Sequence, residues 1–212
     1  MHDTGPLLKA PPPAGLPPGT PRDYAITVPD TWVLIPLEPG RRAKAISALI
    51  RRQFAGTPSA ATARAALRRH LTDLAEAAWQ TGGIEFYLSL MLAGPLPIQA
   101  SLLVSLIPPP PSGPLPVEAV ALDAKKRNRS VSLIQAPAGT GIRAQGSATD
   151  TSFYFSVPGS GAWLLLAFSG PDGPLASAMA DLFDAIAGTL RWAVNGVLGV
   201  TQRADDAIYR LR

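Results

Sequence analysis

The side chains that could perform acid–base or nucleophilic chemistry are few in this sequence and stand apart. His2 and His70 are its only histidines, and cysteine is absent. A serine nucleophile needs a base and an orienting acid within hydrogen-bond reach. His70 instead stands beside Arg68 and Arg69 in a helical pattern, so we interpret it as a helix-surface residue. The sequence therefore predicts no catalytic triad.

Metal and nucleotide sites are not indicated either. Without cysteine the chain can form no thiolate zinc site, iron–sulfur cluster or disulfide. Residues 139–144 (GTGIRA) fit a loose G-x-G-x-x-A pattern, but we expect them between two short strands, whereas a dinucleotide-binding motif opens a helix. Apart from Asp205 and Asp206, the acidic residues are scattered singly. We therefore expect a protein that is not an enzyme and has no cofactor.

The clearest chemical signal is a basic segment without acidic residues. The chain has 19 Lys and Arg against 15 Asp and Glu, but residues 41–69 contain no Asp or Glu. A surface of one charge sign favours a partner of the opposite sign. We predict a partner-binding face from seven arginines: Arg41, Arg42, Arg51, Arg52, Arg64, Arg68 and Arg69. The alternative is a pair of solvated helix faces without a partner.

The expected partner is a protein with an acidic or apolar face. The basic segment lacks interleaved aromatic residues and the helix-turn-helix spacing typical of nucleic-acid binding, so no nucleic-acid partner is expected. A second basic cluster occupies residues 125–129. The oligomeric state is left open by these patterns.

Length and composition predict one folded domain with two tails. The 212 residues are 47% hydrophobic and only 16% charged, which is too apolar for a chain that stays disordered. Residues 1–22 are rich in proline, and we expect them to form a disordered arm. The arm lacks a secretory signal pattern, so a cytoplasmic location is expected. We assign residues 23–192 to the domain and residues 193–212 to a helical tail.

Hydrophobic periodicity predicts the elements of the first half. Residues 24–28 alternate as a strand that leads to Trp32, and residues 41–54 have the spacing of an amphipathic helix. Thr57 and Pro58 are typical of the start of a further helix, which we expect to reach residue 80. Residues 84–93 and 98–107 alternate with a period of two and predict a hairpin. A membrane-spanning helix over the uncharged residues 86–107 is rejected, because two prolines and a glycine interrupt it.

The second half predicts further antiparallel strands and a closing helix. We expect a short helix over 117–124, strands over 131–135, 142–145, 152–157 and 162–168, and a helix over 172–186. The strands are too closely spaced for parallel crossovers. Residues 189–192 are expected to add to the sheet. Trp32 and Trp192 are expected to fill the two ends of the core. The fold class is therefore α+β, an antiparallel sheet covered by helices.

Two segments resemble the PsbP-like superfamily, which includes the DcrB and LpqN branches and eukaryotic Ran-binding relatives. Residues 24–32 (YAITVPDTW) are similar to its opening strand, and residues 182–192 (LFDAIAGTLRW) are similar to its closing helix and strand. The resemblance implies α/β/α layers over residues 23–192 and a binding protein without catalytic residues. The chain departs from the lipoprotein branch because it has neither a signal peptide nor a lipobox cysteine.

The function expected from this resemblance is that of a bacterial, cytoplasmic protein-binding adaptor or chaperone-like module. Its partner would contact either the sheet face or the arginine-rich helices. The alternative is a small-molecule or lipid-binding protein with a cavity between sheet and helices. A closed, well-packed interface without a pocket would count against that alternative.

Overall fold

Seven antiparallel strands form the main sheet. The structure is a computed structural model that describes residues 23–54, 61–93, 96–127, 129–147, 149–193 and 208–210. The strand order is β2-β3-β6-β10-β9-β8-β7, and all the pairs are antiparallel, as predicted. The strands are β2 (Trp32–Pro36), β3 (Gly83–Ser89), β6 (Ser101–Ile107), β7 (Ser130–Ala136), β8 (Gly139–Gln145), β9 (Asp150–Ser156) and β10 (Trp163–Ser169).

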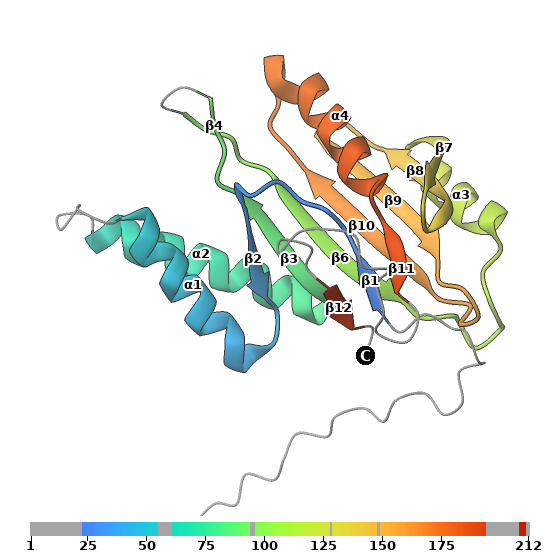
Figure 1. Cartoon of the computed structure of the whole chain (residues 1–212), viewed down its shortest axis with the longest axis horizontal. Coiled ribbons are helices and arrows are strands. Elements are labelled where there is room, and N and C mark those ends of the chain that lie inside the picture. The colour runs from blue at the N-terminus through green and yellow to red at the C-terminus, as the bar shows by residue number, and fades with distance from the viewer. Residues whose placement is uncertain are drawn as a thin grey trace, which may run out of the picture.

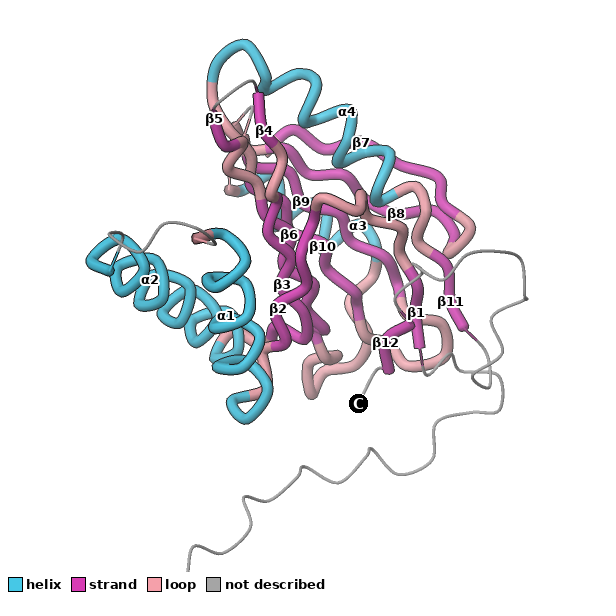
Figure 2. The backbone as a smooth tube through the Cα atoms, turned by 60° about the vertical axis from the view of Figure 1, so that its left-hand side comes forward, coloured by secondary structure: helices cyan, strands magenta, loops and turns pink. Residues whose placement is uncertain are grey.

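Helices cover both faces of this sheet. α1 and α2 pack on β2 and β3, whereas α4 lies on the opposite side (Figures 1 and 2). The helices are α1 (Pro39–Gln53), α2 (Ala61–Gln80), α3 (Val117–Lys126) and α4 (Ala176–Ala187), the last preceded by the 3-10 turn η1 (Gly173–Leu175). The predicted α+β class, with an antiparallel sheet between helical layers, is confirmed.

One hydrophobic core lies between α1, α2 and the β2–β3 end of the sheet. Ile46, Leu49 and Ile50 of α1 recur at helical spacing and are buried there. Leu71 and Ala75 of α2 are buried in the same cluster, which confirms most of the predicted stripe. Helix α1 begins at Pro39, where a proline loses no intrahelical hydrogen bond. The predicted start of α2 at residues 57 and 58 lies outside the described residues.

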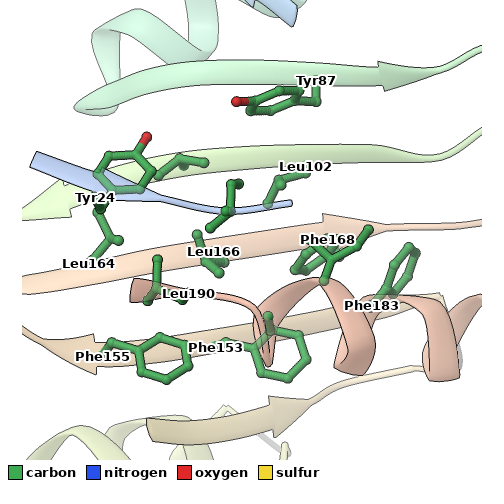
Figure 3. Packing of buried hydrophobic residues seen from close by; sticks show 14 of the residues in the cluster. Tyr24, Tyr87, Leu102, Phe153, Phe155, Leu164, Leu166, Phe168, Phe183 and Leu190 are labelled. Carbon is green, nitrogen blue, oxygen red and sulfur yellow. The ribbon is translucent and has the colours of Figure 1, made fainter. Parts of the chain in front are cut away.

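A second, aromatic core lies between α4 and the sheet. The ring of Phe183 stacks on Phe168 with centroids 4.7 Å apart, and Trp32 meets both rings edge-on at 6.5 Å (Figure 3 shows the two phenylalanines). A Cβ atom at Gly170 would lie 2.9 Å from Cζ of Phe183, so the backbone approaches the ring closely. This interface is filled by side chains. Among the described residues, this packing therefore leaves no ligand cavity between α4 and the sheet for the small-molecule-binding alternative.

The predicted central hairpin is present, but the pairing of its two strands is interrupted near the turn. β3 pairs antiparallel with β6, and Tyr87 stands opposite Leu102. Between them the backbone leaves the main sheet, and β4 (Leu92–Ala93) pairs with β5 (Leu96–Pro97) as a separate small ribbon. No helix among the described residues is long and apolar enough to span a bilayer.

A third, three-stranded sheet joins segments that are distant in the sequence. Its order is β11 (Arg191–Ala193), β1 (Asp23–Ala25) and β12 (Ile208–Arg210). The prediction that residues 189–192 add to the main sheet was therefore wrong, because β11 pairs with β1 instead. Residues 208–210 of the expected helical tail form a strand. The rest of that tail after Ala193 and the arm over 1–22 lie outside the described residues.

Candidate functional site

The sheet face opposite α4 carries two hollows that lie along β6 and β10. Leu164, Leu166 and Phe168 of β10 are buried on the α4 side. Since successive strand side chains alternate between faces, Leu165 and Ala167 point to the other side. Leu165 lines one hollow and Ala167 the other. The hollows therefore follow one another along the same strand.

The first hollow has a volume of about 360 Å³ and lies against the C-terminal half of α2. Its wall includes Leu74 and Ala77 of α2 and Thr81 just after that helix, and its floor includes Leu103 and Ala167 of the sheet. Leu74 is 39% exposed on this wall. The lining is thus mainly apolar and open to solvent.

The second hollow has a volume of about 410 Å³ and lies against α3. Ala119, Val120 and Asp123 of α3 form its wall, and Tyr154 and Leu165 form its floor. Together we call the two hollows the sheet-face groove. The groove offers mainly apolar contacts. Asp123 and Arg127 lie at its rim and form an ion pair with each other at 3.0 Å.

The groove has the width of one helix. α2 contacts β3 and α3 contacts β7 and β8, so the strands β6, β10 and β9 separate the two covering helices. At about 4.8 Å per strand this separation is roughly 20 Å, which is about twice the 8 to 10 Å between the axes of packed helices. One further helix would fit between α2 and α3 with normal packing on both sides.

Most arginines of the predicted partner-binding face are exposed, and the face itself stays a prediction. Arg41, Arg51 and Arg52 of α1 are exposed, and so are Arg68 and Arg69 of α2. Arg64 is partly buried. α2 thus carries basic residues on its N-terminal half and lines the sheet-face groove with its C-terminal half. The sequence analysis did not predict that the C-terminal half of α2 lines a groove.

Arg42 corrects the prediction, because it does not belong to an exposed face. It is buried and ion-paired with Glu76 of α2. A buried guanidinium needs such a partner. Arg42 therefore holds α1 against α2 and is not available to a partner protein.

A buried carboxyl group was missed by the sequence analysis. Glu85 of β3 is only 7% exposed, and its Oε2 accepts hydrogen bonds from the hydroxyls of Tyr24 (2.7 Å) and Tyr87 (3.2 Å). Burial raises the pKa of Glu85 to about 8, although the two tyrosine hydrogen bonds act in the opposite direction. The only signal in the sequence was a glutamate in the alternating run of β3, and that pattern does not show that β1 covers it.

The Glu85 cluster lies apart from the sheet-face groove. A perturbed carboxyl pKa is common in active sites but also occurs in structural networks. None of its three residues lines either hollow of the sheet-face groove. Within the described parts of the chain, no group of three or more acidic or histidine side chains could hold a metal ion. His70 is exposed on α2, as predicted. Residues 139–144 lie within β8 and not between two strands as expected, and they open no helix.

The comparisons with known proteins give one structural likeness. No family model and no curated protein sequence matches the chain. Among solved structures, it is similar to the solution structure of cyanobacterial PsbP (CyanoP) from Synechocystis sp. PCC 6803, with 13% identity over 88% of this chain and 99% of that one, at a TM-score of 0.36. That protein bears the family name of the resemblance noted above. The DcrB and LpqN branches stay a prediction.

Proposed function

We propose that the protein is a non-enzymatic, protein-binding adaptor or chaperone-like module, and that the sheet-face groove takes an amphipathic helix of its partner. The observation that carries this proposal is the pair of mainly apolar hollows along β10, one lined by α2 and the other by α3. A helix laid in such a groove buries its apolar stripe on Leu103, Leu165 and Tyr154 and leaves its polar side in solvent. The cytoplasmic location expected from the sequence stays a prediction.

The shape of the groove favours a macromolecule over a small molecule. Ligand pockets usually enclose most of the ligand surface. The first hollow is open to solvent, and the linings of the two hollows come from residues spread over the length of β10. The lipid- or small-molecule-binding alternative therefore remains an outcome of the test and not the favoured function.

Leu74 gives the sharpest test of the groove, because Leu175 is a matched control. Leu74 is 39% exposed on the groove wall, and Leu175 is 36% exposed in η1, which leads into α4 on the other face. Leu74→Lys is expected to lower partner recovery in pulldowns from native cells at least tenfold, about 1.4 kcal/mol, while Leu175→Lys leaves it unchanged. Thermal melts establish that both variants fold.

Site-specific photo-crosslinking identifies the occupant. A photoreactive residue at position 77, on the groove wall, is expected to link to a partner peptide whose apolar residues recur at helical spacing. The same group at position 175 should not. If Leu74→Lys binds the partner as wild type does, or crosslinks at 77 reach only lipid, the proposed function is wrong.

The exposed arginines are expected to select an acidic partner. Reversing Arg51, Arg52, Arg68 and Arg69 to Glu should reduce recovery at low salt at least tenfold and abolish its salt dependence, because steering by surface charge is screened by ions. The control reverses Lys125 and Lys126, which are exposed on α3. Unchanged recovery after the fourfold reversal would mean that this face is only solvated.

A further inference from the structure

The two edges of the main sheet are built differently. The strand at one edge, β2, has five residues, ends at Pro36, and packs against α1. Proline and a covering helix are the usual means by which an edge is protected from pairing. β7 at the other edge has seven residues that all pair with β8 in unbroken register. In the described part of the chain no strand pairs with its outer side.

β7 also lacks the charged side chains and prolines that prevent an edge strand from pairing with another chain. Its sequence, SVSLIQA, contains no charged residue and no proline. Leu133 at the centre of the strand is 67% exposed. Ile134 and Ala136 pack on the aromatic core, so Leu133 points to the opposite face, the one on which α3 contacts β7. An exposed leucine therefore stands at the centre of an edge strand.

The strand is held in place at both ends. Before it, Arg129 pairs with Asp150 and donates to Oγ of Ser152. After it, the backbone N–H of Ala138 donates to the carbonyl of Leu190 at 2.8 Å. The backbone carbonyl of Ala138 accepts a hydrogen bond from Nε1 of Trp192 at 2.9 Å. An edge fixed in this way loses little further conformational freedom when it pairs with another strand.

We propose that β7 pairs antiparallel with β7 of a second copy of this chain, with the two-fold axis at Leu133. In this register Leu133 stands opposite Leu133 of the second copy, and Ser132 stands opposite Ile134. A symmetric pair brings each central residue close to its own kind, so charged residues there would repel. β7 has none. A foreign strand chosen by charge would find no complementary charge on β7, which favours the second copy as the occupant.

The dimer joins the two main sheets into one and covers the Leu133 side chains. The pairing length is seven residues, or about 24 Å at about 3.4 Å per residue, which is small for a permanent interface. We therefore expect a monomer–dimer equilibrium in the micromolar range. This surface is separate from the sheet-face groove, so the inference goes beyond the proposed function and can fail independently of it.

The test uses sedimentation of the full chain at concentrations from about 1 to 200 µM, a range set by the expected interface size. Wild type is expected to shift from monomer to dimer within it. Leu133→Lys and Leu133→Glu should each raise the dissociation constant at least tenfold, because like charges meet at the axis. Leu175→Lys serves as the control for an exposed leucine elsewhere, and circular dichroism establishes folding.

Mixing the two charged variants separates the proposal from a general loss of structure. Leu133→Lys and Leu133→Glu chains pair opposite charges at the axis, so their mixture should form heterodimers more tightly than either variant dimerises alone. A wild type that stays monomeric at 200 µM, a dimer unaffected by either variant, or a mixture without heterodimers would each overturn the pairing.

Discussion

Replacing Phe183 with alanine is expected to lower the free energy of unfolding by about 3 to 5 kcal/mol. The ring is completely buried, stacks on Phe168 and meets Trp32 edge-on. The surrounding side chains come from several strands of one sheet, which cannot easily collapse into the space left behind. Urea denaturation followed by tryptophan fluorescence measures the loss.

The control for Phe183→Ala is Leu175→Ala, which removes a partly exposed leucine just before the same helix. Exposed side chains contribute little, so its expected cost is below about 1 kcal/mol. If the two substitutions cost the same, the aromatic stack does not provide the packing energy described for it.

The stability of the protein is expected to fall as the pH rises from about 4.5 to 8. Burial raises the pKa of Glu85 from its ordinary value of 4.5 to about 8 in the folded state. Between these values the folded protein keeps a proton that the unfolded chain has released, so stability is fully present at the acid end and is lost with rising pH. The total loss is on the order of 3 to 5 kcal/mol, at 1.36 kcal/mol for each pKa unit.

Glu85→Gln isolates this effect. The amide oxygen can still accept hydrogen bonds from Tyr24 and Tyr87, but the side chain does not titrate. We expect the variant to lose most of the pH dependence and to be more stable than wild type at pH 8. Glu118→Gln, on exposed α3, should keep the wild-type slope. Parallel stability curves for wild type and Glu85→Gln would contradict the assignment.

Local patterns were sufficient for most elements of the fold. The alternation in β3 and β6 predicted their pairing, and the helical spacing of Ile46, Leu49 and Ile50 predicted the buried side of α1. These signals work because each element carries its own period. The turn between β7 and β8 was predicted too long, since only Pro137 and Ala138 separate the strands.

What the sequence did not reveal depends on contacts between distant elements. Arg42 looked like its basic neighbours, and only the packing of α1 on α2 pairs it with Glu76. Glu85 stands in an alternating run like any other strand residue, and only the fold brings Tyr24 of β1 over it. The sheet-face groove is the area that α2 and α3 leave uncovered, so no single segment encodes it.

The pairing of β1 with β11 determines how late in synthesis this part of the fold can form. Asp23–Ala25 leaves the ribosome early, but its neighbour Arg191–Ala193 is made after every strand of the main sheet. Closing so long a loop is slow compared with forming adjacent hairpins. During synthesis Tyr24 therefore lacks its β11 neighbour Trp192 until every strand of the main sheet has been made, and its side of the domain closes last.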